Sequence, residues 1–131
     1  HLTFATLHTS DSIQTINRII DVFPSAQQSQ IRTQLSFVLV GVFCQQLMPR
    51  NDGKGRVLAA EIMVPTDAIR SLVRDDKCHQ VYSLIQTGGK YGMQTMNQCL
   101  FDLFQKNLIT YEDALAKTTN PEDLKRVFQR T

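Results

Sequence analysis

The spacing of apolar residues along the sequence changes at Pro65. Before this residue, strand-type segments alternate with helical ones, and after it every periodic segment has helical spacing. The expected strands are residues 2–7 and 56–64, and the expected helices are residues 12–22, 25–48, 66–75, 78–86, 93–106, 111–117 and 121–129. Because strands that alternate with helices indicate an α/β fold, we expect residues 1–64 to belong to an α/β domain and residues 65–131 to form a helical subdomain.

The helix expected over residues 25–48 is the longest one. Apolar residues recur along it from Ile31 to Leu47 and give it a broad apolar face, so we expect it to lie inside a core. Pro49 ends it, and residues 51–55 form a strong turn signal. A strand pair about this turn is expected to close the sheet.

Composition excludes several classes of protein. The 131 residues carry a net charge of +2 with both signs interspersed, which disfavours a nucleic-acid or membrane-surface partner. The longest apolar run, residues 37–44, is far shorter than the ~20 residues that a membrane span needs. Cys44, Cys78 and Cys99 form no C-x-x-C pair, so we expect neither a zinc site nor a disulfide framework, and a reducing compartment.

The first strand-type run ends in polar side chains directly before a helix. Thr6, His8 and Thr9 occupy this end, and α/β enzymes commonly keep site residues there. An imidazole at this place can sense or orient a phosphate or an attacking water; the alternative is a histidine that only satisfies local backbone groups. We expect the chain to be the back part of a larger α/β domain, with part of its chemistry upstream of residue 1.

Residues 68–75 place two stripes on one expected helix. Ala68, Ile69, Leu72 and Val73 form an aliphatic stripe, while Arg70 and Arg74 lie one turn apart on another. The pattern fits an ordinary solvated amphipathic helix, and it also fits a docking surface on which the arginines guide a partner and the aliphatic residues anchor it. The sequence contains no G-x-x-x-x-G-K-[ST] loop to cradle phosphates.

Taken in order, these segments resemble a known family. Residues 6–9 followed by 15–24 (TLHT…TINRIIDVFP) look like the His-box region of the secretion ATPases that power type II secretion and type IV pili. Residues 68–75 (AIRSLVRD) are similar to the A-I-R-N-L-I-R-E signature of the retraction branch of that superfamily, the PilT family. Residues 86–89 and 92–96 (QTGG, GMQTM) match the same branch. Ser71, Val73 and Asp75 are mild departures that keep the stripes.

The resemblance implies a fold and a function. The chain is expected to be the C-terminal part of a RecA-like P-loop ATPase core followed by an all-helical subdomain, in a cytoplasmic homohexamer that couples ATP hydrolysis to type IV pilus retraction. The hexamer would work with the pilus assembly platform at the inner face of the bacterial inner membrane. The intact parent would use ATP and Mg²⁺ through Walker residues upstream of residue 1, so this chain alone is expected to bind neither and to hydrolyse no ATP.

The resemblance also assigns roles to residues. His8 carries over as the His-box histidine near the γ-phosphate, with Thr6 and Thr9 beside it. The expected coupling segment comprises Ala68, Ile69, Arg70, Leu72, Val73, Arg74 and Asp75.

Three other interpretations stay open at this point. The chain can be a helical adaptor without enzyme activity that docks a partner through the 68–75 helix. It can belong to a PilU-like accessory retraction ATPase, which the Ala-Ile-Arg run disfavours. A DNA-translocating ATPase is a remote alternative, because no basic and aromatic contact pattern is present.

Overall fold

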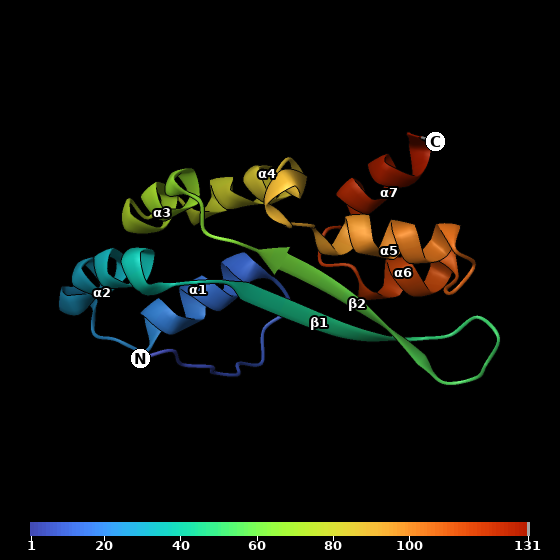
Figure 1. Ribbon diagram of the computed structural model, residues 1–131, viewed down its shortest axis with the longest axis horizontal. Coiled ribbons are helices and arrows are strands. Elements are labelled where there is room, and N and C mark those ends of the chain that lie inside the picture. The colour runs from blue at the N-terminus through green and yellow to red at the C-terminus, as the bar shows by residue number, and fades with distance from the viewer. Residues whose placement is uncertain (131) are drawn as a thin grey trace.

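A hairpin of two antiparallel strands runs through the molecule and joins two groups of helices (Figure 1). The computed structural model describes residues 1–130. Helices α1 (Ser12–Asp21) and α2 (Ser25–Val38) precede strands β1 (Val42–Pro49) and β2 (Arg56–Met63). Then follow α3 (Asp67–Arg74), the 3₁₀ turn η1 (Cys78–Gln80), α4 (Val81–Gln86), the 3₁₀ turn η2 (Gly89–Tyr91), α5 (Met96–Gln105), α6 (Tyr111–Lys117) and α7 (Pro121–Gln129).

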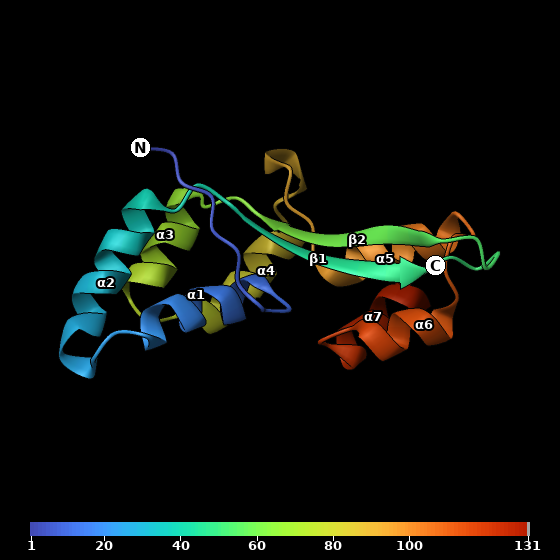
Figure 2. The ribbon, with the colours of Figure 1, turned by 90° about the horizontal axis from the view of Figure 1, so that it is seen from below.

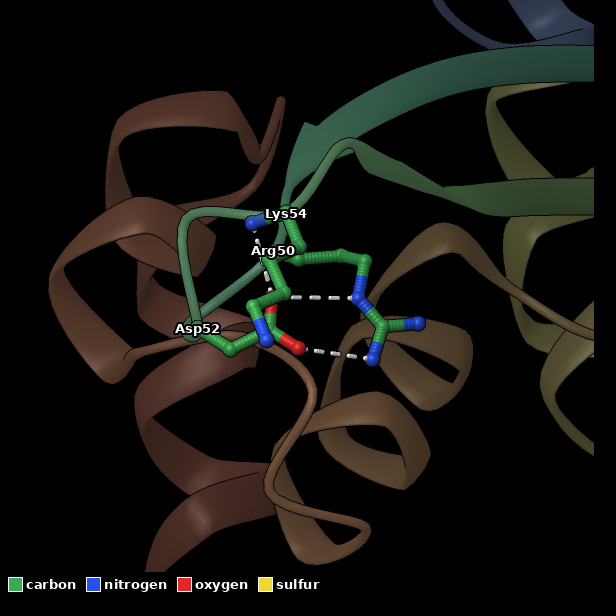
Figure 3. Close-up of polar contacts among 3 residues, drawn as sticks. All are labelled: Arg50, Asp52 and Lys54. Atoms are coloured by element: carbon green, nitrogen blue, oxygen red, sulfur yellow. Dashed lines mark hydrogen bonds and ion pairs between the residues drawn. The ribbon is translucent and has the colours of Figure 1, made fainter.

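The hairpin turn is closed by its own polar side chains. The guanidinium of Arg50 donates to both carboxylate oxygens of Asp52, at 3.0 and 3.3 Å, and the Lys54 backbone N–H donates to the same carboxylate at 2.9 Å (Figure 3). These hydrogen bonds lower the pKa of Asp52, with that from Arg50 contributing most. Gly53 and Gly55 adopt positive φ angles of 72° and 90°, which favour glycine. The turn signal over residues 51–55 is thus confirmed.

Two hydrophobic cores lie along the inner face of the hairpin. The first joins the α1–α4 group to the strand ends through residues such as Ile16, Val42, Met63, Ile69 and Val81. The second packs α5, α6 and α7 against the other half of the hairpin, and its buried residues are Met48, Ala59, Met96, Leu100, Leu103, Ile109, Ala114 and Leu124. Both cores contain residues from either side of Pro65, and the division of the chain at this residue stays a prediction.

A buried polar network connects α4 with the second helical group. The carboxylate of Asp123 on α7 accepts hydrogen bonds from the Tyr82 hydroxyl at 2.6 Å, the Gln86 amide at 3.0 Å and the Asn97 amide at 2.8 Å. Burial, followed by the Asp123 carboxylate, raises the pKa of Tyr82. Because each buried polar group has partners, the network fixes α4, α5 and α7 relative to one another.

The single helix predicted over residues 25–48 is wrong. Helix α2 ends at Val38, Leu39 is extended, and the chain continues as β1. The apolar run through Val42 and Phe43 suits a helix or a strand, because β-branched and aromatic residues favour strands while the apolar spacing also fits a helix. Pairing with β2 decides the matter: Val42 lies opposite Met63 and Leu47 opposite Leu58.

The strand predicted over residues 2–7 is also absent. Residues 1–9 have no regular secondary structure, and Phe4 is 90% exposed. A strand is stable only when another strand pairs with it, and nothing in the described part of the chain pairs with this segment.

The helix predicted from Met93 begins instead at Met96. Residue Gln94 forms a bridge with Ile62, so the chain is still extended there. Thr95 then caps α5 in a reciprocal capping box with Gln98. The remaining predicted helices agree with the structure to within about a turn, although the first turn of the 78–86 helix is the 3₁₀ turn η1.

Candidate functional site: the His8 segment and helix α3

His8 lies on an exposed stretch of chain that leads into α1. The side chains of Thr6 and His8 are exposed, and Thr9 is partly buried. The Thr9 and Thr15 hydroxyls lie 2.6 Å apart, and Thr15 donates its own proton to the Asp11 carbonyl at 2.8 Å. The Thr9 hydroxyl is therefore the donor to Thr15. This bond ties the chain beside His8 to the first turn of α1, while the imidazole itself stays accessible.

Two hydrogen bonds between side chains and the backbone fix the start of α1. The Asp11 carboxylate accepts from the Gln14 backbone N–H at 2.7 Å, and the Gln14 side chain accepts from the Ser10 backbone N–H at 2.8 Å. Such a cap satisfies backbone donors that have no partner within the helix. It thereby sets the direction in which the chain enters α1, four residues after His8.

Glu61 on β2 completes this region, although it belongs to none of the predicted site segments. Its carboxylate accepts a hydrogen bond from the Ser12 backbone N–H at 2.7 Å, and the residue is 2% exposed. Burial raises the pKa of Glu61, partly offset by its hydrogen bonds to Ser12. The missed signal was a charged residue at an inward strand position between the buried Ala59 and Met63.

Helix α3 buries most of its aliphatic stripe in this chain's own core. Thr66 caps the helix, with its hydroxyl accepting from the Ile69 backbone N–H at 3.4 Å. Ile69 and Val73 are fully buried in the first core, and Leu72 packs against it half-buried. The aliphatic stripe is therefore mainly internal packing, a question that the sequence left open.

The two arginines of α3 differ in what they contact. Arg70 Nη1 donates to three backbone carbonyls at the C-terminal end of α2, those of Ser36 at 2.6 Å, Leu39 at 3.1 Å and Phe37 at 3.3 Å. Arg74 is exposed, and its polar contacts within residues 1–130 are to neighbours at its own end of the helix. It donates to the Ser71 hydroxyl at 3.0 Å and lies 3.7 Å from the Asp75 carboxylate. Arg70 thus joins α3 to α2, and Arg74 faces solvent.

A shallow groove runs beside the start of α3. Its walls come from α3, from the end of α4 and from η2, with Ala68, Leu84, Lys90, Tyr91 and Met93 among the lining residues. Ala68 is exposed on this side of the helix. The groove therefore brings part of the 68–75 segment together with the 86–93 segment.

The structure does not join the two predicted site regions directly. Within residues 1–130, no hydrogen bond or ion pair links His8 to α3, and no group of three or more His, Cys, Asp or Glu side chains is arranged to hold a metal ion. None of the helices in the same range has the length and apolar character needed to cross a membrane.

No protein-family model matches the chain. Among curated proteins, the type IV pilus retraction ATPase PilT of Pseudomonas aeruginosa PAO1 is 49% identical over 123 residues, which cover 94% of this chain and 36% of PilT. A twitching motility protein of Neisseria gonorrhoeae is 42% identical, and the match covers 95% of this chain and 33% of that protein. The type IV pilus ATPase PilU of P. aeruginosa is 38% identical, and the match covers 98% of this chain and 34% of PilU. The chain therefore spans about a third of the length of these relatives.

Among solved structures, the crystal structure of the pilus retraction motor PilT with bound ADP superposes with a TM-score of 0.87 at 50% identity, over 96% of this chain and 35% of that one. Over this third of their length, the chain is similar to the PilT retraction ATPases. The resemblance to the retraction branch of the secretion ATPases is confirmed over most of the chain. The expected α/β fold class is also confirmed by the match to the PilT structure.

Proposed function

We propose that this chain is the C-terminal part of a hexameric motor ATPase that couples ATP hydrolysis to type IV pilus retraction. One observation carries the proposal: half of the residues are identical to the ADP-bound retraction motor PilT in the same fold, over 96% of the chain. The lower identity to PilU, 38% against 49% for PilT of the same organism, favours the retraction motor over its accessory relative.

The intact parent would bind ATP and Mg²⁺ with residues that this sequence does not contain. Phosphoryl transfer is catalysed almost entirely by positioning and by charge stabilisation around the β- and γ-phosphates, which requires a P-loop, Mg²⁺ and acidic residues. We therefore expect the 131-residue chain alone to hydrolyse no ATP. The parent would be a cytoplasmic homohexamer that meets the pilus assembly platform at the inner membrane.

We assign His8 the role of a nucleotide sensor in this parent. It is an accessible imidazole on a segment whose next residues are held by hydrogen bonds, through Thr9 to Thr15 and through Asp11 to Gln14. An imidazole in that setting can contact the γ-phosphate or the attacking water and report which nucleotide is bound. Thr6 and Thr9 flank it.

The experiment that tests the motor is steady-state Mg-ATP hydrolysis by the parent protein, with His8→Ala and the exposed His79→Ala as its matched control. We expect turnover by the wild type and by His79→Ala. His8→Ala should lose turnover on the order of 10²-fold, because the substitution removes the side chain that would position the γ-phosphate or the attacking water. A wild type without turnover contradicts the motor. Unchanged turnover in His8→Ala, with the hexamer retained, contradicts the sensor role alone.

For α3, we propose that coupling uses its exposed flank and the adjacent groove. Ile69 and Val73 are buried in this chain and Arg70 is bound to α2, which leaves Ala68, Arg74 and Asp75 for a partner. Arg74→Glu in the parent should abolish retraction while ATP hydrolysis and folding persist. Leu72→Asp should instead destabilise the fold, because a carboxylate beside the first core is costly. Normal retraction by Arg74→Glu would contradict this surface.

A further inference from the structure

We propose that Glu61 is a positioning residue for the His8 segment. Its carboxylate, carried by β2, holds the first residue of α1 and thereby sets where the chain bearing His8 emerges. The inference deepens the role proposed above for His8 and rests on it for its functional part. Its structural part, that Glu61 fixes the start of α1, stands on the contacts alone.

The first backbone N–H groups of a helix have no partner within the helix and need one from elsewhere. At α1 two carboxylates share this work: Asp11 accepts from Gln14, and Glu61 accepts from Ser12. Ser12 is completely buried, so water does not replace a lost partner there. Removing the Glu61 carboxylate would leave the Ser12 N–H unpaired at the point where α1 meets the hairpin.

Contacts with the other strand support the same role. Cys44 lies opposite Glu61 in the strand register, and its sulfur is 3.8 Å from the Thr15 hydroxyl. Thr15 in turn receives the hydrogen bond from Thr9. The first turn of α1 therefore contacts both strands of the hairpin, and Thr9, the residue next to His8, is hydrogen-bonded to that turn. Glu61 supplies the only carboxylate contact from the hairpin to α1 among the hydrogen bonds of residues 1–130.

The position also connects the two site regions through the chain. Glu61 precedes the α3 cap Thr66 by five residues on a continuous path along the end of β2. The strand that holds the start of α1 is therefore the strand that leads into α3. A shift of the His8 segment that moved Ser12 would have to break or carry with it a buried 2.7 Å hydrogen bond to β2.

The first test uses the 131-residue chain and does not depend on ATPase activity. Amide hydrogen exchange is compared among wild type, Glu61→Ala, Glu61→Gln and the matched control Glu112→Ala, an exposed glutamate in the first turn of α6. We expect exchange of the Ser12 amide to rise about tenfold in Glu61→Ala, the effect of losing one hydrogen bond. Glu61→Gln, which keeps an acceptor, and the control should keep wild-type protection, as should Leu124 of α7 in the second core. Unchanged Ser12 exchange in Glu61→Ala overturns the inference.

The second test measures kcat and KM for Mg-ATP in the parent hexamer. Glu61→Ala should lower kcat by about tenfold at unchanged KM, because the sensor is misplaced while the nucleotide is bound elsewhere. Glu61→Gln should restore most of the activity, a rescue that a requirement for charge alone would not give. A wild-type kcat in Glu61→Ala overturns the positioning role, whereas an inactive wild type refutes the proposed motor and leaves the exchange result to decide on Glu61.

A second variant guards against loss of folding. Ser12→Pro removes the N–H donor while Glu61 stays in place, and proline is tolerated at the first residue of a helix. The preceding Asp11 is already extended, as a residue before proline prefers. If Glu61→Ala does not fold, the Ser12→Pro variant tests the inference in its place. A reduced kcat at unchanged KM in Ser12→Pro supports the inference, and a wild-type kcat overturns it.

Discussion

Gly88 lies where the connection between α4 and η2 passes close to its neighbours. A Cβ atom at this position would lie 2.3 Å from the Met93 methyl carbon and 2.8 Å from the Leu84 backbone oxygen. The methionine side chain can move, but the carbonyl belongs to the α4 backbone. The next residue, Gly89, has no atom within 4 Å of an added Cβ. Two adjacent glycines therefore meet different packing constraints.

Gly88→Ala is expected to lower the free energy of unfolding by about 1–3 kcal/mol, the usual cost of overpacking. Gly89→Ala is the matched control and should be neutral or slightly stabilising, because alanine restricts the unfolded chain. Urea unfolding of the 131-residue chain measures both. Equal urea midpoints for the two variants would show that Leu84 and Met93 move to accommodate the added methyl group without a loss of stability.

At the scale of elements, α2 and α3 form a pair that Arg70 holds together. Helix α2 has no basic residue in its last turn, so its C-terminal carbonyls depend on a partner from outside. Arg70 supplies it from α3 by donating to the carbonyls of Ser36, Phe37 and Leu39. Arg32 of α2 also forms an ion pair, at 3.3 Å, with Asp76, which lies two residues after the end of α3.

Arg70→Ala is expected to lower the free energy of unfolding by about 1–3 kcal/mol, because it removes charge-assisted hydrogen bonds at the end of α2. Arg74→Ala, on the same helix but exposed, should change it by less than about 0.5 kcal/mol. Urea unfolding of the two variants measures this difference, provided that the dependence of the unfolding free energy on urea concentration is unchanged. An Arg70→Ala midpoint equal to that of Arg74→Ala would rule out the capping role.

Across the whole molecule, the hairpin presents a different face on each side. Figure 2 shows α1, α6 and α7 gathered on one side of the strands. The outward positions carry Phe43, Leu47 and Leu58, which are 66%, 56% and 48% exposed. Leu47 and Leu58 lie directly opposite each other. Monomeric proteins rarely leave contiguous apolar surface of this kind uncovered.

This face should make the 131-residue chain self-associate at high concentration. Leu47→Lys is expected to weaken association strongly, whereas Gln45→Lys, an exposed position on the same face, adds the same charge without removing apolar surface. Sedimentation velocity over a concentration series measures the effect. A wild type that stays monomeric throughout, or two variants with equal effects, would contradict the prediction.

Features that depend on near neighbours in the chain could be predicted from the amino-acid sequence. The helices predicted over residues 12–22, 66–75 and 121–129 begin within a residue of where the structure places them. Their caps Asp11, Thr66 and Asn120 each bond a backbone N–H three residues away, which is a local interaction. The turn at residues 51–55 was predictable for the same reason. The family motifs could be recognised from the sequence without any structure. The segments of the candidate site were found in this way, as were most of the helices.

Features that depend on pairing between distant segments could not be predicted before the fold was known. Residues 42–49 became a strand because β2 lies beside them, and residues 2–7 did not because no strand does within residues 1–130. Arg70 bonds carbonyls more than 30 residues away, and Glu61 bonds an amide 49 residues away. A local pattern indicates which face of a helix or strand a residue occupies. A hydrogen bond between distant segments forms only once the core has brought those segments together. The roles of Arg70 and Glu61 could therefore not be predicted from the sequence.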